Sequence, residues 1–246
     1  MRCFHLLLLL ISTITPSIAQ NSTGMFTVNI TYAGQLSGGD LADDFSNNLN
    51  IGGGIQYMTK NNWIFGVEAN TMFGGNIKKD VLANMRTVEG EIINGDQTFA
   101  IVFLEGRGFY GGLIGGKLIN VVKKFPKSGI RLTASTGILQ HKIRIEDRTG
   151  SLTQLQGEYL KGYDRLTNGF MTYQFLGYQL LDPKKRLDFF VGVDFLQGYT
   201  QNRRSWNWDT RERDTRKRQD FQLGIKAGII IPLYKKDKSE ELFFED

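Results

Sequence analysis

The sequence predicts an all-β chain in which eight antiparallel strands close into a transmembrane up-and-down β-barrel. Three observations carry this prediction: an apolar leader, eight segments in which apolar and polar residues alternate, and gaps between them that are alternately long and short. Alternation with a period of two places one set of side chains on each face of a strand. The 246 residues, 41% of them hydrophobic, suffice for one large domain or two small ones.

The bulk composition resembles that of a water-soluble protein. A mean hydropathy of −0.26 excludes a polytopic helical membrane protein, and 12% aromatic residues exclude a disordered chain. A barrel turns only every second residue of each strand toward lipid, so its average hydropathy stays low. The single cysteine, Cys3, excludes a disulfide framework and the usual zinc sites, and we expect neither a metal nor a cofactor.

The N-terminal leader has the features of an export signal. Arg2 supplies the positive start, residues 6–11 form the apolar run, and Ser17 with Ala19 fits the small-x-small cleavage rule. The run is too short to span the ~30 Å hydrocarbon core of a bilayer. We therefore expect cleavage after Ala19 and a mature chain located in the outer membrane of a bacterial cell. The predicted division is a signal peptide at 1–19, a barrel at 20–234 and a charged periplasmic tail at 235–246.

The alternating segments are long enough for membrane strands, which need ~9–11 residues. The phase is clear in six of them and blurred in two, 98–118 and 169–181. The eight predicted strands are 26–32, 51–57, 63–70, 98–118, 130–138, 169–181, 187–195 and 221–229.

The gaps between the strands alternate in length. A meander with this pattern has all its long loops at one end, as in a membrane barrel with four long extracellular loops and three short periplasmic turns. A soluble barrel of the lipocalin type is the first alternative, and a sandwich is the second. The long gaps are 35–48, 74–97, 146–167 and 201–220, and the short ones are 60–61, 120–128 and 182–185.

One face of the predicted strands is apolar and the other is small or polar. We expect the apolar face to contact lipid and the other to line a lumen just wide enough for packed side chains. Aromatic residues near the strand ends fit two interfacial girdles: Tyr57, Trp63, Phe189 and Tyr234 at one end, and Tyr32, Phe73, Tyr199 and Phe221 at the other. The charged residues expected to form a lumen network are Glu68, Arg131, Asp188, Asp194 and Lys226.

This combination of leader, strands and loops resembles the small eight-stranded outer-membrane β-barrels of Gram-negative bacteria. The Ser-Ile-Ala/Gln cleavage site and the stretch 157–169 resemble those of uncharacterised Bacteroidota proteins. The family often ends on the aromatic residue of the last strand. Here the predicted strand end, Tyr234, is followed by the charged tail.

Some small barrels that this chain resembles in size are lipid A-modifying enzymes with a histidine and a serine. His141 is the only candidate in the predicted mature chain. Ser135 is six residues away on the same strand, about 20 Å at ~3.3 Å per residue, too far for a nucleophilic pair. We therefore interpret His141 as a polar residue near the barrel rim, and we assign no catalytic residue.

The long loops carry the candidate contact residues. Arginines interleaved with tryptophans in the fourth loop suit anionic sugars or lipopolysaccharide, although acids within the loop also allow internal pairing. Ile77, Val81, Leu82 and Met85 are spaced as one face of a short helix in the second loop. The contact candidates are Arg203, Arg204, Trp206, Trp208, Arg211, Tyr163 and Arg165.

The expected function is a non-enzymatic outer-membrane barrel, a structural or accessory subunit of a larger assembly for protein secretion or barrel insertion. The expected partners are outer-membrane lipid, lipopolysaccharide and other envelope proteins, with no nucleic acid. The alternatives are a lipid A-modifying enzyme that uses His141 and a narrow pore.

Overall fold

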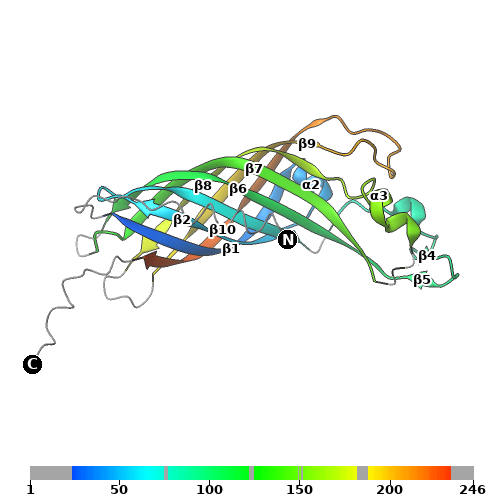
Figure 1. Cartoon of the computed structure of the whole chain (residues 1–246), viewed down its shortest axis with the longest axis horizontal. Coiled ribbons are helices and arrows are strands. Elements are labelled where there is room, and N and C mark those ends of the chain that lie inside the picture. The colour runs from blue at the N-terminus through cyan, green and yellow to red at the C-terminus, as the bar shows by residue number, and fades with distance from the viewer. Residues whose placement is uncertain are drawn as a thin grey trace, which may run out of the picture.

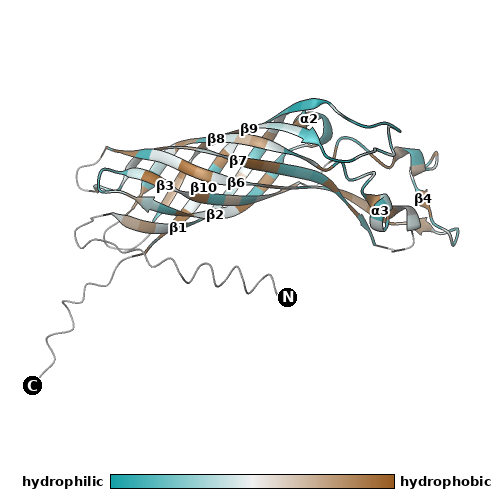
Figure 2. Ribbon diagram, turned by 45° about the horizontal axis from the view of Figure 1, so that its top comes forward, coloured by the Kyte–Doolittle hydropathy of each residue, from teal (hydrophilic) through white to brown (hydrophobic). Residues whose placement is uncertain are grey.

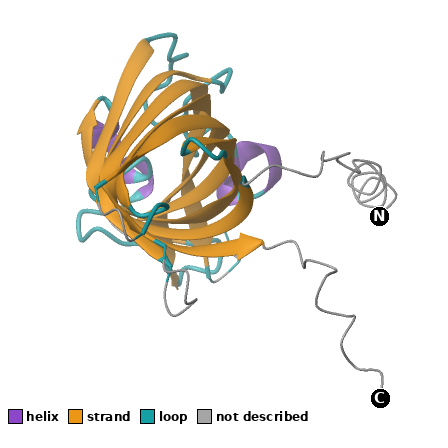
Figure 3. Ribbon diagram, turned by 90° about the vertical axis from the view of Figure 1, so that its left-hand side faces the viewer, coloured by secondary structure: helices purple, strands orange, loops and turns teal. Residues whose placement is uncertain are grey.

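Eight antiparallel strands pair in one closed ring, in the order β1-β10-β9-β8-β7-β6-β3-β2, which confirms the predicted barrel (Figure 3). The computed structural model describes residues 24–74, 77–121, 125–148, 150, 152–181 and 188–233. The barrel strands are β1 (Met25–Gly39), β2 (Asn48–Met58), β3 (Trp63–Gly74), β6 (Val102–Asn120), β7 (Gly129–Asp147), β8 (Thr167–Leu180), β9 (Phe189–Asn202) and β10 (Lys217–Leu233).

The short connections lie at one end of the barrel and the long loops lie at the other (Figure 1). The ring closes between the first and last strands, where Phe26 pairs with Leu233 at the short-turn end. The predicted signal peptide, Tyr234 and the charged tail fall outside the described residues.

The predicted faces are also confirmed. On β1, Ile30 is 53% exposed whereas its neighbour Thr31 is 5% exposed, and on β3, Phe65 is 52% exposed whereas Glu68 is 7% exposed. The same alternation follows the ribbon of the barrel wall (Figure 2). An apolar outside and a partly polar inside are the arrangement of a barrel whose wall is covered by lipid. No helix among the described residues is long and apolar enough to cross a membrane.

Several of the aromatic residues predicted to mark the strand ends face outward. Trp63 is 48% exposed at the short-turn end, and Tyr32 and Tyr199 are 50% and 51% exposed on the outer wall. Trp63 also stacks on Phe65, with 6.3 Å between ring centroids. These amphipathic rings suit the two membrane interfaces.

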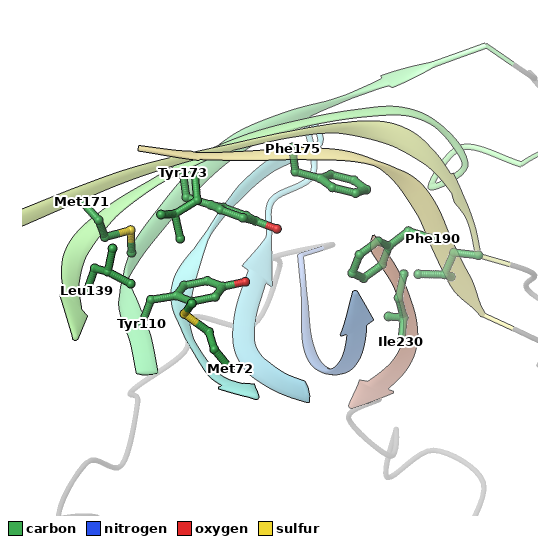
Figure 4. Close-up of a cluster of buried hydrophobic side chains, with 10 residues drawn as sticks. Met72, Tyr110, Leu139, Met171, Tyr173, Phe175, Phe190 and Ile230 are labelled. Carbon is green, nitrogen blue, oxygen red and sulfur yellow. The ribbon is translucent and has the colours of Figure 1, made fainter. Parts of the chain in front are cut away.

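The two strands with a blurred pattern are blurred because aromatic side chains occur on both faces. In β6, Phe109 points outward while Tyr110 is fully buried, and in β8, Phe170 points outward while Tyr173 is 1% exposed. The inward rings and neighbouring aliphatic side chains fill part of the lumen (Figure 4). The cluster consists of Met72, Tyr110, Leu139, Met171, Tyr173, Phe175, Leu181, Phe190, Leu196 and Ile230.

Three sequence predictions need correction at the long-loop end. The strands are longer than predicted, because β1 continues to Gly39 and β10 begins at Lys217. Phe99–Ala100, predicted as the start of a barrel strand, is β5, which pairs with β4 (Ile92–Ile93) in a separate small sheet. The predicted helix around Val81 is a single 3₁₀ turn at Ala83–Met85.

The long loops and the ends of β6 and β7 build a second core outside the barrel, which we call the outer lobe. Val81 and Leu82 are fully buried there, so the predicted apolar positions do pack although they form no α-helix. Two further short helices belong to the long loops: α2 (Leu41–Asp44) and α3 (Gly157–Leu160), the latter preceded by a 3₁₀ turn at Thr153–Leu155. The buried residues of the lobe are Leu41, Phe45, Val81, Leu82, Ile92, Ala100, Ile143, Leu152 and Leu155.

Candidate functional site: the lumen, its outer mouth and the outer lobe

Glu68 of β3 and Lys226 of β10 form an ion pair across the lumen. Their side chains are each 5% exposed, and Lys226 Nζ lies 3.3 Å from Glu68 Oε2. The hydroxyl of Ser135 donates to the other carboxylate oxygen, and the Lys226 ammonium lies 4.7 Å from the ring centroid of Tyr173. A charge in so dry a site needs such a partner, because an unpaired buried charge is costly.

Arg131 is held mainly by amide oxygens. Its guanidinium donates to the side-chain oxygens of Gln179 and Gln56, and it lies 4.5 Å from the ring centroid of Phe190. The glutamines come from β8 and β2, so this one side chain connects three strands. Sequence reasoning missed both glutamines, because an inward glutamine differs little from an ordinary polar residue of a strand.

Asp194 and Asp188 complete the set predicted for the lumen. Asp194 is 1% exposed and accepts hydrogen bonds from the Tyr173 hydroxyl, at 3.1 Å, and from the amide of Gln35. Asp188 is 9% exposed at the short-turn end, where its backbone carbonyl accepts from Ile230 N. All five predicted lumen residues therefore point into the barrel.

The lumen has almost no free space between these groups. The described residues around Glu68, Arg131 and Lys226 enclose a cavity of about 10 Å³. Such a volume holds about one water molecule. The space found between these three side chains is therefore too small for a water-filled channel.

Helix α2 covers the outer mouth of the barrel. Asp44 accepts from Arg218 Nη2 at 2.8 Å, and both side chains are buried, at 7% and 5% exposure. The same guanidinium donates to the Asp40 carbonyl, while the Asp40 carboxylate accepts from Gln219 N. These bonds hold the first long loop against β10.

His141 lies beneath this cover, 3% exposed, and its Nε2 lies 2.9 Å from Asp220 Oδ2. The hydroxyl of Thr200 donates to the same carboxylate oxygen, and Phe45 packs edge-on against the imidazole. The other ring nitrogen, Nδ1, is buried without a hydrogen-bond partner among the described residues. Ser135, considered as a nucleophile, donates to Glu68 instead.

The arginines of the fourth loop divide into paired and exposed groups. Arg204 binds both carboxylate oxygens of Asp164, which raises the pKa of Arg204, and Arg165 pairs with Asp209. Arg203 donates to the side chain of Asn168, 2.5 Å away. Arg204 of the fourth loop and Arg165 of the third thus join the two loops, and Arg203 binds the fourth loop to the start of β8.

The remaining contact candidates lie at the surface of the loops. Trp206 and Trp208 are 43% and 44% exposed, and Arg211 is exposed with a positive φ of 55°. Tyr163 packs partly buried against the outer-lobe core, and burial raises the pKa of its hydroxyl. Trp208 N donates to the carbonyl of Gly162, so the indole lies over the third loop.

The outer wall of the lobe carries a feature that sequence reasoning did not single out. Phe99, Ile101 and Phe103 are 64%, 55% and 44% exposed, and Ile93 pairs beside Phe99 at 51% exposure. The Arg148 guanidinium lies 4.5 Å from the ring centroid of Phe103. We call these four residues the lobe strip. Their period of two was the signal available in the sequence.

A charged band separates the lobe strip from the lipid-facing wall. Glu105 and Arg107 follow Phe103 on the outward face of β6 and pair with each other, and Arg144 of β7 lies 3.8 Å from Glu105. The wall proper resumes at Phe109, which is 46% exposed. Because charges do not lie in hydrocarbon, this band marks the outer limit of the apolar barrel wall.

Comparison with known proteins assigns no family to the chain. No family model and no curated protein matches the chain. Among solved structures, the chain is similar to Ail, the attachment invasion locus protein of Yersinia pestis, with 11% identity over 85% of this chain and 99% of that one and a TM-score of 0.46.

A second similar structure is Neisserial surface protein A, with 8% identity over 86% of this chain and 99% of that one and a TM-score of 0.41. A third is the N-terminal β-barrel domain of Pseudomonas aeruginosa OprF, with 11% identity over 85% of this chain and 100% of that one and a TM-score of 0.38. All three are small outer-membrane barrels of Gram-negative bacteria. Such low similarity assigns no function, and the closed barrel rests on the strand pairing of this chain.

Proposed function

We propose that this chain is a non-enzymatic, non-conducting outer-membrane barrel that acts as an accessory subunit by presenting the outer lobe to another envelope protein. The lobe strip carries this proposal. Four large apolar side chains stand together in water, beyond a charged band, on a lobe with its own buried core. A contiguous exposed apolar patch of this kind is typical of a protein–protein contact.

The rigidity of the lobe supports the same role. β6 and β7 are paired without interruption from Asn120 and Gly129 to Val102 and Asp147, so one hairpin runs from the short-turn end into the lobe. A partner that binds a preformed surface loses little free energy in ordering it. Protein secretion or barrel insertion is the kind of assembly we propose to test first.

The surroundings of His141 support a non-enzymatic role. A nucleophilic triad needs a hydroxyl bonded to the imidazole and a carboxylate behind it. Here Nε2 of His141 is hydrogen-bonded to the carboxylate of Asp220, and the hydroxyl of Thr200 donates to that carboxylate rather than to the ring. We expect His141→Ala to leave the mass of lipid A unchanged in cells; a mass change in lipid A that this variant abolishes would support the enzyme instead.

The packed lumen supports a closed barrel. We expect the purified protein to give no steady ion conductance in planar bilayers, because the network around Glu68 leaves only about 10 Å³ free. Stable single-channel steps from the purified wild-type chain would contradict a non-conducting role.

The accessory role is tested by purifying the tagged full-length chain from detergent-extracted membranes of its native cell. We expect one or more stoichiometric subunits with the wild-type chain and their loss with Phe99→Glu. The matched control is Tyr159→Glu, an equally exposed aromatic residue on α3 at 62% exposure. The proposal is wrong if no subunit co-purifies with the wild-type chain, or if Phe99→Glu retains the subunits as well as the control does.

A further inference from the structure

The lipid-facing wall is not smooth. A groove of about 460 Å³ crosses the outside of β6, β7, β8 and β9, and its lining is almost entirely apolar. This size is typical of small-molecule sites, which occupy roughly 300–1,000 Å³. The outward residues that matter are Trp63, Gly115, Lys117, Ala134, Gln174 and Phe195.

Two small residues create the depression. Gly115 and Ala134 lie opposite each other in the β6–β7 ladder, and both point outward. No atom lies within 4 Å of the position that a Cβ on Gly115 would occupy, so the space above it is open. The wall therefore has a trough where other rows carry leucine, isoleucine or valine.

The groove begins at a cation near the short-turn end. Lys117 is three residues from the end of β6, and its ammonium lies 4.4 Å from the ring centroid of Trp63. Among the described residues, Lys117 has no carboxylate within ion-pair distance. A lysine beside a tryptophan at the end of a membrane strand lies at the headgroup level, where phosphate is the abundant anion.

Farther along the groove, a polar amide interrupts the apolar wall. Gln174 points outward on β8, directly opposite Ala134 and two residues beyond Leu176, which shares the register row of Lys117. An amide that faces bare hydrocarbon costs free energy. The amide therefore lies on the far side of the trough from the charged end of the groove.

We infer that this groove binds one anionic glycerophospholipid of the leaflet at the short-turn end. Its phosphate pairs with Lys117, and one acyl chain lies in the trough over Gly115 and Ala134 and passes Gln174 toward Phe195. Along the groove the charge comes first and the apolar trough follows, which is the order of phosphate and acyl chain in the lipid.

The test is native mass spectrometry of the full-length chain released from micelles that contain phosphatidylglycerol, or phosphatidylethanolamine with the same chains. We expect one retained phosphatidylglycerol on the wild-type chain and at least a tenfold loss with Ala134→Leu, which fills the trough. The matched control, Ala227→Leu, adds the same bulk to an exposed alanine of β10 outside the groove and retains the lipid.

A second variant removes only the charge. Lys117→Gln is expected to weaken phosphatidylglycerol retention about fivefold, which corresponds to ~1 kcal/mol for one lysine near an anionic headgroup. It weakens phosphatidylethanolamine retention less, because the ammonium of that headgroup already pairs with the phosphate. The inference is overturned if Ala134→Leu and Ala227→Leu retain the lipid equally, if Lys117→Gln has no effect on phosphatidylglycerol, or if a photo-crosslinker at position 134 captures a polypeptide instead of lipid in native membranes.

Discussion

Replacing Lys226 with methionine tests whether the charged pair in the lumen stabilises the barrel. Methionine keeps much of the volume of the lysine stem but removes the ammonium that lies 3.3 Å from Glu68. Both side chains are 5% exposed, so the carboxylate left behind is buried without a cation. Removing one partner of a buried pair typically costs 3–5 kcal/mol. We expect a loss near the lower end, ~3 kcal/mol, because Ser135 still donates to Glu68.

The double variant Glu68→Gln/Lys226→Met separates a charge effect from a packing effect. The glutamine oxygen still accepts from Ser135, and no buried charge remains uncompensated. A pair replaced by neutral groups of similar volume is often close to neutral in stability. We expect the double variant to unfold within ~1 kcal/mol of the wild-type chain, and so to be about 2 kcal/mol more stable than Lys226→Met.

Equilibrium unfolding in urea, with the barrel folded in phospholipid vesicles, measures these differences through tryptophan fluorescence. The control is Lys117→Met, the same substitution on the outer wall, where no buried carboxylate is left behind; it should change the free energy of unfolding by less than ~1 kcal/mol. The reasoning is refuted if Lys226→Met is as stable as this control, or if the double variant is no more stable than Lys226→Met.

Three further predictions concern the loops, the mouth and the leader. Gly162→Ala places a Cβ within 2 Å of the Trp208 indole and should detach the fourth loop, so trypsin cleaves at its arginines several-fold faster; Gly95→Ala, where nothing lies within 4 Å, should not change the rate. Arg218→Met leaves the buried carboxylate of Asp44 unpaired and should cost ~3 kcal/mol in urea unfolding, whereas the exposed Arg216→Met should cost under ~0.5 kcal/mol. The intact mass of the chain from native membranes should correspond to a first residue of Gln20; a mass that includes Met1 would contradict export by signal cleavage.

The barrel was predictable because, in most strands, apolar residues face outward and small or polar residues face the lumen. Thr27, Asn29 and Thr31 are buried while Ile30 is exposed, as the period of two requires. The pattern failed only where both faces carry aromatic residues, since lipid and a packed lumen accept the same rings. Tyr110 and Phe109 are adjacent, and no hydropathy scale shows that the first fills the lumen while the second contacts lipid.

The outer lobe was less predictable for a different reason. The spacing of apolar residues in a loop indicates which side chains are buried but not which backbone conformation they adopt. Val81 and Leu82 are therefore buried as expected, although the segment forms no α-helix. The end of the lipid-facing pattern likewise does not mark the end of a strand, because backbone pairing continues into water. The β6–β7 ladder reaches the pair Val102 and Asp147, well beyond the charged band at Arg107. The groove at Gly115 exists because Ala134 lies opposite it on the next strand. That pairing follows from the strand register, which the sequence alone does not give.

The lumen and the lobe are coupled at the outer mouth. Phe45 belongs to the lobe core and packs edge-on against His141, which is bonded to Asp220 of β10. Arg218, two residues earlier on the same strand, holds Asp44 of α2. The lobe is thus fixed to the barrel by the long β6–β7 hairpin on one side and by these buried contacts on the other. A partner seated on the lobe strip would therefore be held in a defined orientation relative to the membrane wall, which a lobe on a flexible linker could not provide.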